Sequence, residues 1–430
     1  MQIVCFVLLL VTGLSLGNLQ KITLQNTKPY IAEPVLPQRP FVAVWNIDTG
    51  HCKSKYGVNI DLSSFDIVNN PNETHNGDNM MIFYDKMMGL YPFYEKDGTP
   101  VNGGIPQLAD IGAHYHKCIE DIEKYIPEKD YSGLAVIDWE SWRPVWHHNG
   151  WGNGLIYQNA SKLKVKKEHP TWDDTQITAQ AKTEFEKAAK NYMLGTLEIA
   201  ELLRPKAKWG YYLYPDCWNY AKNGSDFTCS QQTIDFNNEI EWLFEKSTGL
   251  YPSTYVGLWF KDSNNTVLYA GNRILETLRV DRNRASNVAI PVYAYNNLVY
   301  RQTREFLTKK DVIHSSGIAA ALGASGVVLW GDGMEVSKSQ CQKLQDYVQG
   351  TLGPYLKMVS DAADVCSIQM CYGHGRCVLS DSAKTNIIQP PKMFTSLIET
   401  ALPGLYIYTY KCQCYEGFYG SDCKHFLEME

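Results

Sequence analysis

Two acidic residues, Asp138 and Glu140, are the side chains of this chain best placed to do chemistry. They follow residues 134–137, four apolar residues in a row, which is typical of a fully buried strand. Because residues i and i+2 of an extended chain point to the same side, both carboxylates are expected on one face at the carboxyl end of that strand. Parallel α/β barrels place their active sites at this end of their strands.

Two acids on one face repel each other when both are charged, so one of them is expected to hold a proton near neutral pH. A protonated acid beside a charged one is the combination that cleavage of a glycosidic bond needs. The local pattern therefore predicts a glycoside hydrolase site. The alternative is that the two acids are a solvated strand end or an N-cap for the next helix.

The composition fits a soluble, globular chain that is rich in aromatic residues. The 430 residues, 44% hydrophobic and 20% charged, are enough for a large core. Most of the 28 tyrosines and 11 tryptophans are expected to fill that core, although aromatic faces are also the usual platform for sugar rings. The net charge of −6 gives no support for a nucleic-acid partner, and it is compatible with a local basic groove for an anionic polymer.

The N-terminal residues 1–17 predict a signal peptide. They are rich in Val, Phe and Leu and end in small residues, although no basic residue precedes the apolar run. No later segment approaches 18 continuous apolar residues and the C-terminal end is polar, so no membrane anchor is expected. We expect a secreted protein, with a lysosomal location as the alternative.

Cysteines and sequons agree with that expectation. Of the 12 cysteines, 11 remain once the predicted signal peptide is removed, so an oxidising compartment would pair most of them and leave one free. Each of the four N-glycosylation sequons is short enough to arise by chance, and their use depends on secretion. The sequons are at Asn72, Asn159, Asn223 and Asn264.

Apolar runs and helical segments alternate along most of the chain. The expected strands are residues 41–46, 80–84, 133–140, 209–215, 251–259, 290–295 and 326–330. The expected helices are residues 115–125, 171–203 (one helix or two), 233–244, 268–279, 303–322 and 339–356. Seven such units favour a distorted (β/α) TIM-like barrel of about seven parallel strands in residues 18–360. An open doubly wound sheet is the alternative, weakened because no Gly-rich phosphate motif is found.

The composition changes near residue 361, and six cysteines follow. Gly417, Phe418 and Gly420 lie between the last of them, in a pattern that resembles an epidermal-growth-factor-like (EGF-like) module with a long insertion at residues 378–411. We therefore assign residues 361–430 to a small disulfide-rich module, since a zinc site fits poorly with a secreted chain. The resemblance implies the disulfides Cys366–Cys377, Cys371–Cys412 and Cys414–Cys423.

Several motifs together resemble the animal hyaluronidase family. The most specific is Asp138-Trp139-Glu140-Ser141-Trp142-Arg143-Pro144, and the others are residues 82–84, 103–107, 209–217, 250–255 and 323–331. The resemblance runs from about Phe41 to the C-terminus, and the appended cysteine module also occurs in vertebrate-type members. It implies a distorted (β/α) barrel and an endo-acting β-N-acetylhexosaminidase that hydrolyses the β-1,4 bonds of hyaluronan.

The resemblance also implies roles for individual residues. Glu140 would be the general acid and base, while Asp138 would hold the substrate acetamide, whose oxygen attacks the anomeric carbon with retention of configuration. The remaining candidate substrate-binding residues are Tyr84, Asp85, Arg143, Tyr212, Tyr255, Arg273, Tyr295 and Trp330. The arginines would bind glucuronate carboxylates, although Arg143 could equally be a structural partner of the acids.

The family pattern further implies the disulfides Cys52–Cys341 and Cys217–Cys229. Cys118 is then left over and is expected to be a buried, inert thiol, with an intermolecular bridge as the alternative. His147 and His148 lack a third ligand at sensible spacing, so neither a metal nor another cofactor is expected.

The expected partner is hyaluronan, and the expected state is a monomer. Two other functions stay open. One is a hydrolase of the same family that prefers chondroitin. The other is a non-catalytic glycan-binding or cell-recognition protein, although such a protein would usually have lost Glu140.

Overall fold

The computed structural model describes residues 28–69, 76–77, 79–220, 226–331, 333–380 and 410–426. The predicted signal peptide, the sequons at Asn72 and Asn223 and most of the insertion at residues 378–411 lie outside these residues. The other two sequon asparagines, Asn159 and Asn264, are exposed.

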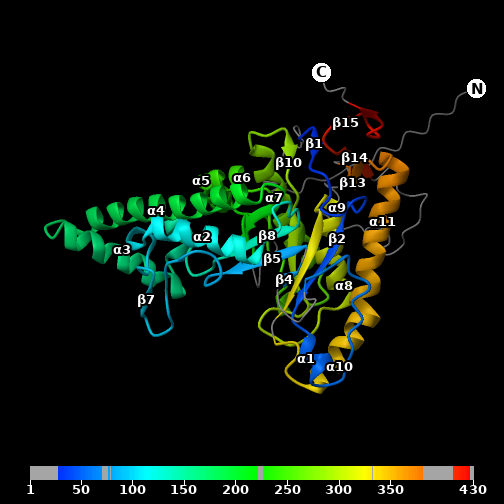
Figure 1. Cartoon of the computed structure of the whole chain (residues 1–430), viewed down its shortest axis with the longest axis horizontal. Helices are drawn as coiled ribbons and strands as arrows, with labels where there is room; N and C mark the ends of the chain where they lie inside the picture. Colours follow the sequence, from blue (N-terminus) through cyan, green and yellow to red (C-terminus); the bar gives the residue numbers. More distant parts are fainter. Residues whose placement is uncertain are drawn as a thin grey trace, which may run out of the picture.

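Parallel strands form the centre of the molecule (Figure 1). One sheet has the order β11 (Tyr293–Asn297), β12 (Gly326–Gly331), β2 (Val42–Ile47) and β3 (Ile67–Val68), and all its neighbours are parallel. The other has the order β4 (Asn76–Gly77), β5 (Met80–Tyr84), β8 (Leu134–Asp138) and β9 (Lys208–Tyr211), in which only β4 is antiparallel.

Residues 250–253 connect the two sheets. Tyr251 bridges to Tyr212 just after β9, and Ser253 bridges to Tyr295 in β11, both in parallel. The sequence predicts a continuous strand over residues 251–259, but the structure has only isolated bridges here. Pro252 lacks the backbone N–H that a regular ladder needs, which explains the difference.

The two faces of these strands have different partners. Alternate residues of one face gather in a single apolar cluster, which includes Val42, Val44, Met80, Ile82, Leu134, Val136, Tyr251, Tyr293, Tyr295 and Val328. The residues between them, such as Ala43, Phe83, Ile137 and Leu329, belong to a larger core that also contains the helices. Residues from both sheets thus share one apolar cluster, an arrangement that fits the predicted barrel. Among the described residues β3 and β5 are not paired, so hydrogen-bonded closure stays a prediction.

The helices cover the outside of the strands. They are α1 (Gly50–Ser54), α2 (Ile111–Tyr125), α3 (Leu155–Glu168), α4 (Asp174–Leu203), α5 (Gln231–Glu239), α6 (Glu241–Lys246), α7 (Asn265–Asn283), α8 (Lys309–Val312), α9 (Ile318–Leu322), α10 (Lys338–Tyr347) and α11 (Gly353–Cys371). Helices α2, α3 and α4 extend to one side of the strands, and α10 and α11 run along the other (Figure 1). No described helix combines the length and the apolarity needed to cross a bilayer.

Side-chain caps mark where helices α4 and α8 begin. Asp173 caps α4 in a capping box, because its side chain accepts from Gln176 N and Gln176 Oε1 accepts from Asp173 N. The helix expected from residue 303 begins only at Lys309, after the N-cap Thr308. Helix α3 was not predicted from the sequence.

The described residues contain the five disulfides that the resemblance implies. They are Cys52–Cys341, Cys217–Cys229, Cys366–Cys377, Cys371–Cys412 and Cys414–Cys423. Cys118 is free and buried, and burial raises the pKa of its thiol to about 12, so it stays protonated.

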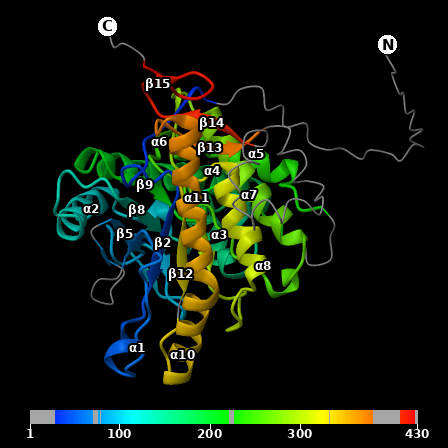
Figure 2. The same ribbon diagram turned by 90° about the vertical axis from the view of Figure 1, so that its right-hand side faces the viewer.

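The C-terminal cysteine-rich segment packs against the rest of the protein. Helix α11 runs through residue 361, where the sequence places the domain boundary, and ends beside β13 (Gly375–Leu379) and β14 (Tyr410–Cys414) (Figure 2). Arg376 is buried and donates to Gly323 O at 2.7 Å and to Ser325 Oγ at 2.9 Å, directly before β12. Arg39 pairs with Asp66, near β3, and with Asp364 of α11.

We therefore expect that a chain shortened to end at Ala363 will have a lower thermal midpoint than the full chain. The cut removes Asp364 and Arg376, and it leaves buried acceptors at Gly323 and Ser325 without their donor. Differential scanning calorimetry would measure the change, with a chain ending at Phe426 as the control for shortening. An unchanged midpoint would show that these contacts do not stabilise the fold.

Candidate active site

The two carboxylates leave the carboxyl end of β8 on one side of the chain. Asp138, the last residue of β8, is half-buried, while the Glu140 side chain is 53% exposed. Trp139 between them is buried and points the other way, where its ring stacks on Tyr91 at 4.7 Å. The alternation expected for an extended chain is therefore present, with Asp138 at the inner and Glu140 at the outer position.

Asp138 holds the proton that the pair is expected to carry. Burial, reinforced by the nearby charge of Glu140, raises the pKa of Asp138 from 3.8 to about 8. Arg143 opposes this shift, and Asp85, just after β5, adds to it. Asp138 Oδ1 is buried and has no hydrogen-bond partner among the described residues, so no hydrogen bond from them offsets the desolvation of this oxygen.

Aromatic side chains from the ends of neighbouring strands surround Asp138. Tyr212 follows β9, and its ring lies 4.8 Å from that of Tyr295 in β11 and 6.2 Å from that of Tyr255. The Tyr255 ring stacks at 6.3 Å on Trp330 of β12, whose indole N–H donates to the Tyr84 hydroxyl of β5 at 3.2 Å. This aromatic wall presents apolar rings with polar tips, a combination that suits a sugar ring.

Burial also sets the protonation state of these tyrosines. It raises the pKa of Tyr212, Tyr255 and Tyr295 far above the usual value, so their hydroxyls stay protonated and can donate. The Tyr212 hydroxyl lies 3.4 Å from Ser253 Oγ. The Tyr295 hydroxyl is buried and has no hydrogen-bond partner among the described residues.

Arg143 lies at the rim beside Glu140. Its guanidinium donates to the Glu140 carbonyl at 2.7 Å and lies 3.3 Å from Glu140 Oε2. Asn149 fixes this turn, because its side chain accepts from Arg143 N and donates to Arg143 O. Of the two roles that the sequence left open for Arg143, the geometry favours that of a partner to the acid.

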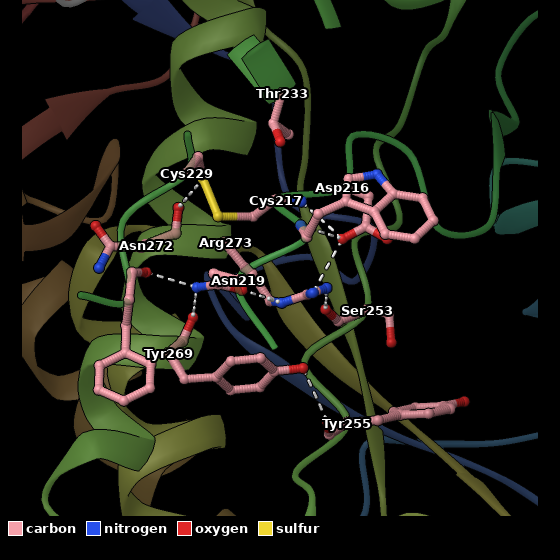
Figure 3. A network of polar contacts seen from close by, with 12 residues as sticks. Asp216, Cys217, Asn219, Cys229, Thr233, Ser253, Tyr255, Tyr269, Asn272 and Arg273 are labelled. Atoms are coloured by element: carbon pink, nitrogen blue, oxygen red, sulfur yellow. Dashed lines mark hydrogen bonds and ion pairs between the residues drawn. A yellow bond between two sulfur atoms is a disulfide. The ribbon is translucent and has the colours of Figure 1, made fainter. Parts of the chain in front are cut away.

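Arg273 is buried in the interior next to the site, where a bound polymer could not contact it (Figure 3). It lies on α7, is only 2% exposed, and pairs with Asp216 Oδ1 at 3.0 Å. It also donates to Asn219 Oδ1 at 2.9 Å and to Ser253 O at 2.8 Å. The expected contact with a glucuronate does not fit this position, because the guanidinium is committed to these buried partners.

The structure thus brings together six of the expected site residues. These are Tyr84, Asp138, Tyr212, Tyr255, Tyr295 and Trp330, with Asp85, Glu140 and Arg143 beside them. Asp216 and Ser253, which fix the loops that carry the tyrosines, were not predicted from the sequence. Both lie inside the motifs of residues 209–217 and 250–255, but nothing in those motifs shows which side chains point inward.

The two histidines after the acid pair belong to an aromatic cluster. His147 stacks on Phe236 at 4.9 Å, and the ring of His148 lies 5.1 Å from that of Trp218. Within the described part of the chain, no group of three or more His, Cys, Asp or Glu side chains is arranged to hold a metal ion.

Comparison with known proteins gives consistent matches. Residues 30–426 match the model of the hyaluronidase family. Hyaluronidase-1 of Bos taurus is 38% identical over 409 residues, which cover 91% of this chain and 90% of the bovine protein. Hyaluronidase-2 of Homo sapiens is 37% identical over 414 residues, which cover 91% of this chain and 87% of the human protein.

A solved structure agrees with the sequence matches. The crystal structure of bee venom hyaluronidase in complex with a hyaluronic acid tetramer is similar to this structure, with a TM-score of 0.65 and 31% sequence identity. The similarity covers 74% of this chain and 99% of the bee chain.

The raised pKa of Asp138 predicts that Asp138→Asn will stabilise the protein. The gain in stability over the wild type is expected to increase as the pH rises. The carboxyl ionises near 3.8 in the unfolded chain and near 8 in the folded one. The wild type therefore loses stability from about pH 4 to pH 8, by at most about 1.4 kcal/mol per pH unit, whereas the amide does not titrate.

Thermal melts of both proteins between pH 5 and pH 8 would measure this difference. Asp346→Asn, at an exposed position of α10, controls for the loss of a surface carboxylate. A melting difference between Asp138→Asn and wild type that is constant over this range would contradict the assignment of the proton to Asp138.

Proposed function

Because this chain belongs to the hyaluronidase family of glycoside hydrolases, we propose that it is a secreted endo-β-N-acetylhexosaminidase that hydrolyses the β-1,4 bonds of hyaluronan. The observation that carries the proposal is the acid pair at the end of β8, which holds one proton at neutral pH inside an aromatic wall. The hyaluronic acid tetramer bound by the bee venom relative supports the choice of polymer.

The proposed reaction uses the substrate's own acetamide as the nucleophile. The acetamide N–H donates to Asp138, and this hydrogen bond stabilises the ionised form of that carboxyl. The proton that Asp138 held then becomes available to Glu140, whose exposed carboxyl can reach the leaving oxygen. Glu140 subsequently takes a proton from water, which opens the cyclic intermediate with retention of configuration.

The aromatic wall would hold the reacting sugar. Tyr212 and Tyr255 keep their protons and so can donate to the acetamide oxygen and to nearby hydroxyls. Trp330 would close the wall around the acetamide methyl group, and the Tyr84 hydroxyl holds the Trp330 indole in place. The proposed (β/α) barrel fixes these groups before the substrate binds, so they need little reorganisation in the transition state.

Three further proposals complete this function. The disulfides fit an oxidising compartment, and a secreted protein is proposed in preference to a lysosomal one. The C-terminal disulfides fit the proposed EGF-like module, which supplies no residue of the acid pair or the wall. Chondroitin stays the alternative substrate, because it differs from hyaluronan at one hydroxyl of the hexosamine and in sulfation.

Glu140→Gln is expected to lower cleavage of hyaluronan by at least about 10²–10⁴-fold, because the amide cannot donate or accept the catalytic proton. Product sizing of defined hyaluronan and chondroitin polymers would measure the activity. Glu120→Gln, at an exposed position of α2, is the matched control. A Glu140→Gln protein that retains substantial activity would contradict the assignment, and equal cleavage of chondroitin would broaden the substrate class.

The pKa of Asp138 also predicts the alkaline limit of activity. Below about pH 8 the pair retains the proton that Glu140 must deliver, and above this pH the proton is lost. The kcat/KM for hyaluronan is therefore expected to fall about tenfold per pH unit above about pH 8. A profile that stays flat to pH 10, while thermal melts show a folded protein, would show that the pair does not supply the proton.

A further inference from the structure

A cluster of partly exposed aromatic rings lies beside the acid pair and has no part in the proposed reaction. It consists of His147, His148, Trp151, Trp218 and Phe236, and we call it the aromatic platform. Trp151 is 45% exposed and Trp218 is 36% exposed, and the two rings lie next to each other. An exposed apolar group of this kind often marks a binding surface.

The rings of the platform support one another. Trp151 and Trp218 meet edge to face, with centroids 5.6 Å apart and planes at 90°. His147 contacts Trp151 at 5.6 Å and stacks on Phe236 of α5 at 4.9 Å, so the loop after β8 is joined to the helix after β9. The two tryptophan faces are thus held in place before any ligand arrives.

Trp218 is held in a backbone conformation that a bulky residue rarely adopts. Its φ angle is 53°, in the left-handed region, which carries a steric cost. Asp216 Oδ1 accepts from Trp218 N at 3.0 Å, and Arg273 pairs with the same oxygen. The Cys217–Cys229 disulfide is attached at the preceding residue (Figure 3). Several independent contacts therefore keep this indole at the surface.

His148 of the platform is uncharged near neutral pH. Burial lowers the pKa of His148 to about 4, and this outweighs the opposing effect of Asp216, while His147 and Arg143 lower it further. A neutral imidazole between two indoles fits the apolar C–H face of a sugar ring better than it fits a carboxylate.

Hydrogen bonds within the loop after β8 link the platform to the catalytic centre. Asn149, next to His148 in the chain, exchanges hydrogen bonds with the backbone of Arg143 at 2.9 and 2.7 Å. Arg143 in turn contacts both the carbonyl and the carboxylate of Glu140. Glu140 and the platform residues of the loop after β8 are therefore held in fixed positions relative to each other.

We propose that the aromatic platform is an additional sugar subsite, which stacks a pyranose ring of the same polymer outside the ring that Asp138 and Glu140 act on. The inference rests on the proposed function for the identity of the polymer. It predicts that the platform contributes to the cleavage of long chains and contributes nothing to the shortest oligosaccharides that are cleaved, because these end before they reach it.

Trp151→Ala and Trp218→Ala test the subsite. Each is expected to lower kcat/KM on polymeric hyaluronan about two- to tenfold, mainly through KM, and to leave the rate on the shortest cleaved oligosaccharide unchanged. Trp218→Phe keeps an aromatic face and is expected to restore most of the loss. Tyr419→Ala removes another exposed aromatic, 46% exposed in the C-terminal segment, and is the matched control.

Two outcomes would overturn the subsite. One is an unchanged kcat/KM on polymer for both alanine variants, and the other is an equal loss on all chain lengths, which would indicate a structural role.

A binding measurement separates the subsite from the proposed function. In it, hyaluronan oligosaccharides are titrated calorimetrically into Glu140→Gln and into the double variant that also carries Trp151→Ala. If the wild type cleaves neither hyaluronan nor chondroitin, the proposed function fails, and a chain-length-dependent loss of binding on Trp151→Ala still supports the subsite.

Discussion

The burial of one carboxyl group, Asp138, next to a second acid is the constraint on which the site depends. If both carboxyl groups were solvated, both would be ionised at neutral pH and neither could donate a proton. Desolvation of Asp138 together with the charge of Glu140 keeps one proton in the pair. The same desolvation lowers the stability of the folded protein. This loss occurs at the position where the proposed reaction needs a protonated carboxyl group.

The surrounding structure maintains that burial. Strand β8 lies between β5 and β9, so its carboxyl end is flanked by two other strand ends that deliver Tyr84 and Tyr212. Tyr295 and Tyr255 add further rings around Asp138, and burial raises the pKa of both, so their hydroxyls stay protonated. Behind this wall, Arg273 neutralises Asp216 and fixes the carbonyl of Ser253, so one buried cation orders two loops of the site.

Much of this could be predicted from the sequence, and the failures have physical causes. Alternation along an extended chain placed Asp138 and Glu140 on one side, because that depends only on local geometry. The position of Arg273 could not be inferred, since it depends on which face of α7 packs inward. Residue 361 marks a change in composition, but helix α11 continues through it, and composition does not show that Arg39 pairs with Asp364 of this helix or that Arg376 donates to Gly323 O.

The central claim is that Asp138 carries the shared proton of the pair, and a carboxyl titration tests it most directly. The protein labelled with ¹³C at its aspartate carboxyl carbons would be followed by NMR between pH 4 and pH 9, with Asp138→Asn to assign the resonance. The account predicts that the resonance missing from Asp138→Asn titrates near pH 8. A resonance for Asp138 that has completed its titration below pH 5 would contradict the account.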